Sequence, residues 1–398
     1  ISRHHVDRRS NSTWSHCIGV IMSMKYNTTK VKFSSLVDFL EDVDIEPEEL
    51  QRGVVCSSEW QSKFFLSVIK GVKLPEVFLS IQDEPYSIKD RIGNEILVIK
   101  KNIDGLQRLT TIQDIMSGKV RLPNKMEEFP ELEGMNYPDI QKADPATARK
   151  IKFTDVDFVE YTGLSAQEES YMFRIVLNNG NKMEAQQKRN PIVAEIASHV
   201  RRNSRSLRDS DCHKLFAIDN INGKEVAKCF NFVPKKMQFD EEYARILFWI
   251  KNGISVSAGN PGLDAMYLDP SFERHLDCLS VLYNRKVNLG DEGLKILDKL
   301  YDIFGNGKYV QETDKRTLRS AVLFIFEIQK WEKSNGRTVK DLSKLFWRLH
   351  DKLMTLTEDD KKVGLKHTVY DGNLSKIAVS SNVMENCEQW EQLIEKEV

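Results

Sequence analysis

Two short apolar runs, a glycine break and an amphipathic helix follow one another in the first third of the chain, and this order most constrains the fold. The runs at 77–81 and 96–99 are rich in Val, Ile and Leu and predict two strands. After Asp104 and Gly105, apolar residues recur every three or four positions and predict a helix that ends at Gly118. The pattern therefore predicts a mixed α/β unit in which a helix begins where a strand ends.

The surrounding sequence extends this unit and then changes character. Serines before residue 36 predict a short capped helix, and Trp60 begins a helical repeat that Gly71 ends. Farther along, apolar periodicity predicts a long amphipathic stretch over 183–199. Three stronger helices are expected at 291–304, 316–333 and 339–356.

These patterns predict an α+β protein with four segments. Residues 1–30 are expected to be a leader or disordered tail, and 31–125 an α/β domain. Residues 126–165 turn polar and contain prolines, which is typical of a connection. Residues 166–398 are expected to form a mainly helical region.

Composition excludes several classes of protein. The 398 residues carry 58 Lys and Arg against 59 Asp and Glu, a formal net charge of -1, so any contact with nucleic acid must come from a local patch. The 6 cysteines are scattered singly, which favours a reducing compartment and argues against structural zinc. No apolar run approaches the roughly 18 residues that span a bilayer. We therefore expect a soluble, cytoplasmic protein without a membrane partner.

The turn at 104–108 carries the sharpest chemical signal. A helix that starts at a strand end presents unpaired N–H groups and a positive dipole end, which favours anions. Gly105 permits close approach of a ligand, and Arg108 offers two parallel donors to a phosphate. Asp104 is a candidate for Mg²⁺ or a reacting water, and Gln107 for positioning. The alternative is structural, with Asp104 as a helix cap that forms an i,i+4 ion pair with Arg108.

The chain resembles the N-terminal domain of GmrSD-type restriction endonucleases. That family carries an Asp-Gly-Gln-Gln-Arg-Leu-Thr-Thr run after a strand, which residues 104–111 match except at Leu106. The other matches, in the family's order, are Gln51 and Arg52 before Trp60, the Gly-to-Pro segment 71–75, and the segment 177–180 followed by Gln186 and Arg189. Together these motifs cover roughly residues 30–200.

The resemblance implies a ParB/sulfiredoxin-like fold that binds a nucleoside triphosphate. The resemblance implies that six residues form the binding site for the phosphates. They are Gln51, Arg52, Asp104, Gly105, Gln107 and Arg108. Asp104 and Gln107 would be catalytic, with Asp104 holding Mg²⁺. The family couples nucleotide hydrolysis to DNA in restriction or phage-conflict systems. Leu106 removes one polar side chain, which makes binding a firmer expectation than hydrolysis.

DNA contact is expected from a basic cluster, although a solvated helix end is an equal alternative. The main members of the basic cluster are Arg201, Arg202 and Arg205, whose guanidinium groups could contact DNA phosphates. The His-x-x-Pro start of a His-Asn-His nuclease is absent from the sequence, so on the first hypothesis we expect a partner subunit to supply any nuclease activity. The competing prediction is a non-enzymatic DNA-binding or adaptor protein. A nuclease within the α/β domain is a third class, and it would need more metal-binding carboxylates than Asp104 alone.

Overall fold

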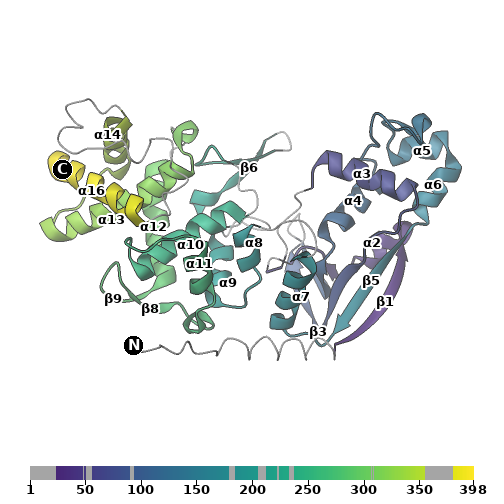
Figure 1. Cartoon of the computed structure of the whole chain (residues 1–398), viewed down its shortest axis with the longest axis horizontal. Helices are drawn as coiled ribbons and strands as arrows, with labels where there is room; N and C mark the ends of the chain where they lie inside the picture. Colours follow the sequence, from purple (N-terminus) through teal and green to yellow (C-terminus); the bar gives the residue numbers. More distant parts are fainter. Residues whose placement is uncertain are drawn as a thin grey trace, which may run out of the picture. The chain divides into compact units, whose positions relative to one another are not determined.

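A computed structural model of the chain describes residues 24–47, 49–50, 56–89, 94–178, 184–204, 212–221, 224–232, 237–305, 307, 309–354 and 380–398. The chain divides into two compact units, residues 1–182 and 183–398 (Figure 1). The first unit contains a mixed sheet with helices, and the second is mainly helical, so the expected α+β class is confirmed.

The first unit is built on five strands. They are β1 (Lys25–Lys32), β2 (Val43–Asp44), β3 (Val77–Lys89), β4 (Glu95–Asp104) and β5 (Asp155–Thr162). Their order in the sheet is β1-β5-β3-β4-β2. β1 pairs antiparallel with β5 and β3 antiparallel with β4, whereas β3–β5 and β2–β4 are parallel. β3 and β4 contain the two predicted strands and extend beyond both.

Successive side chains along each strand point to opposite faces of the sheet, so its two faces have different neighbours. One face packs against helices through a core that includes Val77, Leu79 and Phe158. These helices are α2 (Leu36–Phe39), α3 (Ser58–Ile69), α4 (Leu106–Met116), α5 (Tyr137–Ala143) and α6 (Pro145–Lys152). The short turn η1 (Phe33–Ser35) leads into α2, and η2 (Pro130–Leu132) lies between α4 and α5. The helix α7 (Ala166–Asn178) packs against β4, and its buried Glu169 binds Lys101 of that strand.

The structure differs from the expected segment limits in two places. Residues 25–30, expected within a leader, belong to β1, which pairs along its whole length with β5. The expected connection 126–165 contains α5, α6 and β5, and β5 lies between β1 and β3 in the sheet. The prolines that suggested a connection fit this structure, because Pro130, Pro138 and Pro145 each stand in the first turn of a helix.

Two glycines end helices as predicted. Gly71 follows α3 and has φ +71°. Its N–H donates to the carbonyl of Val68, and the N–H of Val72 donates to the carbonyl of Ser67. Gly118 follows α4, has φ +78° and is part of the same hydrogen-bond pattern, with its own N–H donating to the carbonyl of Ile115 and that of Lys119 to the carbonyl of Asp114. This pattern defines a Schellman motif. The α3 helix is capped by Ser57, whose Oγ accepts from the Trp60 N–H. The lengths of α3 and α4 are therefore set by local sequence.

The second unit surrounds one apolar core. Its helices are α8 (Ala185–Arg189), α9 (Glu195–Ser204), α10 (Gln238–Asn252), α11 (Asn260–Tyr267), α12 (Leu289–Phe304), α13 (Lys315–Asn335), α14 (Leu342–Met354) and α16 (Ser380–Glu397). The described part of this unit also contains two small hairpins, β6 (Ile218–Ile221) with β7 (Lys224–Ala227) and β8 (Asp277–Ser280) with β9 (Arg285–Asn288). Its short turns are η3 (Lys214–Phe216), η5 (Pro270–Phe272) and η6 (Val310–Glu312).

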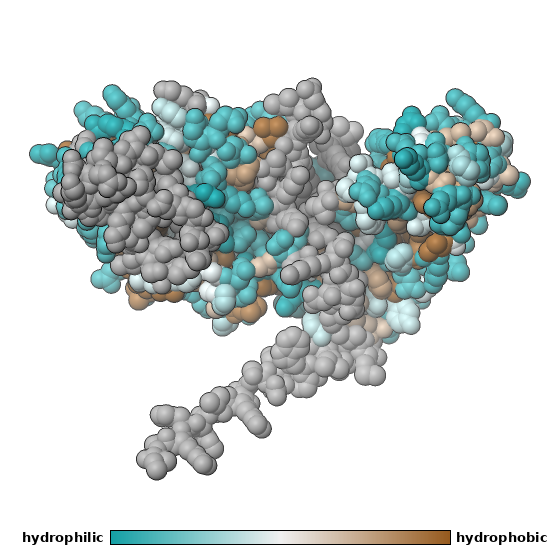
Figure 2. Space-filling view, turned by 45° about the horizontal axis from the view of Figure 1, so that its top comes forward, coloured by the Kyte–Doolittle hydropathy of each residue, from teal (hydrophilic) through white to brown (hydrophobic). Residues whose placement is uncertain are grey.

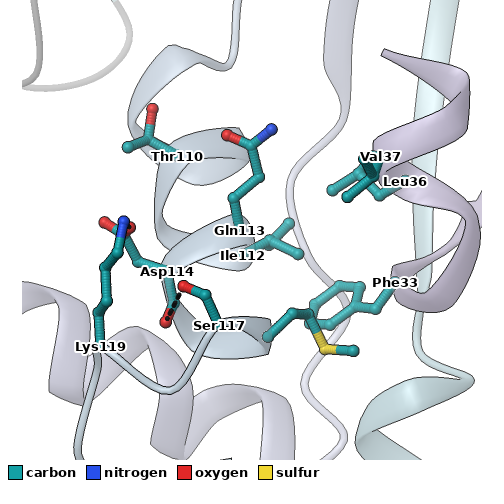
Figure 3. Close-up of a pocket in the computed structure, with 10 residues that line it drawn as sticks. Phe33, Leu36, Val37, Thr110, Ile112, Gln113, Asp114, Ser117 and Lys119 are labelled. Carbon is teal, nitrogen blue, oxygen red and sulfur yellow. Dashed lines mark hydrogen bonds and ion pairs between the residues drawn. The ribbon is translucent and has the colours of Figure 1, made fainter. Parts of the chain in front are cut away.

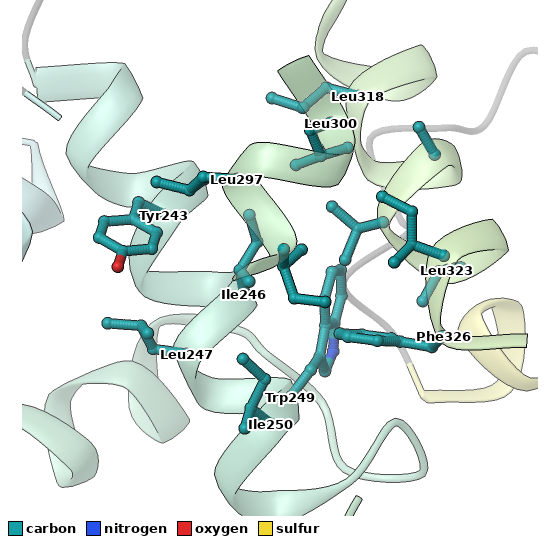
Figure 4. Close-up of a cluster of buried hydrophobic side chains, with 14 of the residues drawn as sticks. Tyr243, Ile246, Leu247, Trp249, Ile250, Leu297, Leu300, Leu318, Leu323 and Phe326 are labelled. Carbon is teal, nitrogen blue, oxygen red and sulfur yellow. The ribbon is translucent and has the colours of Figure 1, made fainter. Parts of the chain in front are cut away.

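The core of the second unit explains the strong helical periodicity of the sequence. Trp249 of α10 is fully buried and lies among aliphatic and aromatic side chains of α10, α12 and α13 (Figure 4). The three strongest predicted helices correspond to α12, α13 and α14. The long helical stretch expected at 183–199 is instead two helices, because Pro191 follows α8 and cannot continue its hydrogen bonding.

The face drawn in Figure 2 is mainly hydrophilic, with hydrophobic positions in small patches. Across the described ranges, no helix combines the length and the apolar character that crossing a membrane requires.

Candidate functional site

The turn that follows β4 places the strongest candidate residues together. Asp104 is the last residue of β4, Gly105 is the N-cap of α4, and Gln107 and Arg108 lie in the first helical turn. The structure describes no side chain that caps this helix at its N-cap position. A glycine at the N-cap has no side chain that could accept from the first N–H groups of α4, and a helix start of this kind can accommodate an anion.

Gly105 is required by the backbone and by packing. Its φ is +137°, a conformation that L-residues with a side chain rarely adopt. A Cβ built on it would lie 2.7 Å from Cγ1 of Val77 on the neighbouring strand β3. The glycine thus lets the helix start close to the sheet, which explains its position in the motif without any ligand.

Asp104 and Arg108 form a short ion pair. Nη2 of Arg108 donates to Oδ2 of Asp104 at 2.6 Å, and both side chains are mostly buried, at 17% and 20% exposed. The Nε of Arg108 is buried and meets no acceptor in the part of the chain that the structure describes. The i,i+4 ion pair of the structural alternative is therefore present, whereas Asp104 does not cap the helix, because the N-cap of α4 is Gly105.

Gln107 is oriented by residues remote in sequence. Its Oε1 accepts a hydrogen bond from the backbone N–H of Cys56 at 2.9 Å, just ahead of α3. Thr111 continues the contact, because its Oγ1 donates to the Gln107 carbonyl and lies 3.9 Å from the Cys56 sulfur. Burial raises the pKa of the Cys56 thiol, so the thiol stays protonated near neutral pH. Gln107 is held in one orientation between α3 and α4.

Cys56 and Thr111 are the residues near the turn that sequence reasoning missed. Thr111 stands within the family-like run of residues 104–111, so its position in the motif was an available signal. Cys56 lies 51 residues from Gln107 and has no local signal. Only the packing of α3 beside α4 brings it to the turn.

The lysines that precede the turn are already paired. Lys100 lies 3.6 Å from Glu160, and Lys101 lies 2.9 Å from Glu49 and 3.1 Å from Glu169. Burial disfavours the charge on Lys101, but the two glutamates outweigh burial and raise its pKa. These ammonium groups neutralise carboxylates on β5, on α7 and just before residue 51, and among the described residues 104–108 the cation is Arg108, itself paired with Asp104.

The remaining nucleotide-site candidates, Gln51 and Arg52, lie outside the described residues. No group of three or more His, Cys, Asp and Glu side chains with the geometry of a metal site occurs among the described residues. A metal at Asp104 would therefore take most of its ligands from water and from a bound phosphate, as Mg²⁺ usually does.

The arginines of the basic cluster in the second unit form hydrogen bonds and an ion pair within that unit. Arg201 donates to the carbonyl of Asn190 and to Oγ of Ser198, and Arg202 donates to Glu195 at 3.2 Å. Arg205 lies outside the described residues. Arg201 thus joins α9 to the end of α8, which neither DNA contact nor a solvated helix end required, while Arg202 pairs within α9 and remains exposed.

Arg189, which belongs to the family-like pattern, is a buried clamp. Its Nε donates to Asp264 at 2.7 Å, its Nη1 to Gln186 at 3.2 Å, and its Nη2 to Oδ1 of Asn260 at 2.9 Å. Gln186 in turn donates to the Tyr267 hydroxyl at 2.9 Å. The side chain of Arg189 is 1% exposed, so it joins α8 to α11 and has no surface to offer a ligand.

Comparison of the chain with models of known protein families, with curated proteins and with solved structures finds no match.

Proposed function

We propose that this protein binds a nucleoside triphosphate at the turn formed by residues 104–108, in a ParB-like domain of the GmrSD type. The observation that supports the proposal most is the combination at one point of a helix start with a glycine N-cap and of Arg108, whose ion pair in the described part of the chain is with Asp104. The backbone N–H groups and Arg108 would share the phosphate charge.

Asp104 gives the proposal a metal requirement. Its carboxylate lies against Arg108, so a phosphate that approaches the guanidinium also meets a negative charge. A Mg²⁺ ion between the carboxylate and the phosphate oxygens would remove this repulsion. Nucleotide affinity should therefore depend strongly on Mg²⁺.

Hydrolysis is the less supported half of the proposal. Gln107, held by the Cys56 N–H, would position a phosphate oxygen or the attacking water, and Asp104 would orient that water. Leu106 replaces the second polar residue of the family's run and is buried, so it offers nothing to a ligand. We expect binding to be retained and turnover to be slow.

The biological setting follows from the same resemblance. We propose that the protein acts in the cytoplasm on DNA, in a restriction or phage-conflict system, with nuclease activity supplied by a partner subunit. The described contacts of Arg201 make the basic cluster of the second unit a weaker DNA site than the sequence suggested.

The test is a thermal-shift panel with ATP, GTP, CTP and UTP, each with and without Mg²⁺. We expect stabilisation by at least one nucleotide, lost without Mg²⁺ and in Asp104→Asn. The control is Asp38→Asn, which changes an exposed carboxylate on α2. Absence of a shift with every nucleotide, together with DNA binding that ignores nucleotide, would favour the adaptor alternative.

A further inference from the structure

A pocket of about 460 Å³ lies between α4 and the segment formed by η1 and α2, apart from the residues of the turn (Figure 3). Phe33, Leu36 and Val37 line one side, and Ile112 and Gln113 of α4 face them. This volume is within the range of pockets that hold small organic molecules. The walls belong to one unit and to two well-packed elements, so the space is part of the fold.

The chemistry of the lining selects the kind of ligand. The exposed apolar surface on one side comes mainly from Val37, which is 62% exposed and borders the buried Phe33 and Leu36. Gln113 offers a carboxamide with both a donor and an acceptor, and Thr110 adds a hydroxyl. Neither side chain forms a hydrogen bond within the described part of the chain. A ligand must therefore combine an apolar face with a polar edge.

The two charged side chains at the rim balance each other. Asp114 is neutralised by Lys119 at 3.3 Å and also accepts from Nε2 of Gln61 at 3.3 Å. The pocket therefore has balanced charge, and an anion or cation would gain little there. A flat heteroaromatic ring suits it, because its faces contact the apolar wall while its edge meets the carboxamide, as Gln does with adenine edges.

We propose that the pocket between α2 and α4 binds an uncharged planar heterocycle of about the size of a purine nucleoside. This inference does not rest on the proposed phosphate site, because the turn at 104–108 recognises charge and the pocket does not. The two can therefore be tested separately with ligands that have no phosphate.

The experiment is saturation-transfer NMR on the full chain with adenosine, guanosine, cytidine and uridine, with ribose as a negative control. We expect a purine nucleoside to bind saturably and ribose not to bind. Gln113→Ala should weaken binding by about three- to tenfold, as expected for loss of a hydrogen bond. Val37→Lys, which places a charge on the exposed part of the apolar wall, should abolish it.

Gln141→Ala is the matched control, because Gln141 lies on α5 and lines no part of the pocket. Circular dichroism melts of the variants establish that they remain folded. Failure of every nucleoside to bind the wild-type protein would overturn the proposal. So would equal affinity in wild type, Gln113→Ala and Val37→Lys, whatever the result with nucleotides at Arg108.

Discussion

Arg108 in the first unit and Arg189 in the second are both arginines within family-like motifs, yet their surroundings differ. Arg189 is 1% exposed and its guanidinium donates to Gln186, Asn260 and Asp264. Arg108 has Asp104 as its charged partner and keeps a buried Nε that meets no described acceptor. Arg189 thus has partners on two helices, whereas Arg108 has one charged partner in its own helical turn, and the proposed phosphate contact concerns Arg108 alone.

Arg189→Ala should have the largest effect on stability. It removes a buried charge and leaves Gln186 and Asn260 without their donor, so we expect the second unit to lose about 3–5 kcal/mol. Urea unfolding measures the change. Arg202→Ala is the control, because Arg202 is 63% exposed and should change stability by less than about 1 kcal/mol. Equal effects in the two variants would contradict the clamp role of Arg189.

His199 tests whether other polar groups inside the second unit are also structural. Burial lowers its pKa from 6.5 to about 4, and its Nε2 lies 2.7 Å from the Tyr243 hydroxyl. Between these two pH values His199 is protonated in the unfolded chain but not in the folded one. The contribution of His199 to the free energy of unfolding is therefore fully present above pH 6.5 and decreases as the pH falls toward 4. The loss should be on the order of 3 kcal/mol.

Urea unfolding of wild type and His199→Gln at pH 7.5, 5.5 and 4.5 measures this linkage. We expect the gap between the proteins to narrow as the pH falls, because the variant has no imidazole to protonate. Parallel curves for the two proteins would show that His199 does not carry the pH dependence.

Gly105→Ala should disturb the turn by a smaller amount. The new Cβ would have both an unfavourable φ of +137° and a 2.7 Å contact with Val77, so we expect a loss of about 1–3 kcal/mol in the first unit. Gly163→Ala separates the two causes, because Gly163 also has positive φ, at +71°, but open space around it. We expect about 1 kcal/mol there. Equal losses would mean that the contact with Val77 adds nothing.

Much of the local structure around the turn could be predicted from sequence. Gly71 and Gly118 marked the ends of α3 and α4, because a left-handed residue after a helix requires glycine in most cases. The strand β4 and the helix start at Gly105 followed from apolar periodicity. These features depend on neighbouring residues, which is why the sequence contains enough information for them.

Features that depend on distant residues could not be predicted. β1 and β5 pair across more than a hundred residues, and the polar residues of β1 give no strong strand signal. The bond between Cys56 and Gln107 likewise requires α3 to pack beside α4. The sequence also does not reveal that Arg189 is enclosed by Asn260 and Asp264, since α11 must first pack against α8.

The most direct test of the contrast between the two arginines is isothermal titration of nucleoside triphosphate and Mg²⁺ into wild type, Arg108→Ala and Arg149→Ala. Arg149 is an exposed arginine on α6 of the same unit and controls for the loss of one positive charge. Arg108→Ala leaves the mostly buried carboxylate of Asp104 without its partner, so we expect the stability of the first unit to fall by about 1–3 kcal/mol. We expect binding to be lost in Arg108→Ala and unchanged in Arg149→Ala. Unchanged affinity in a folded Arg108→Ala protein would contradict the account.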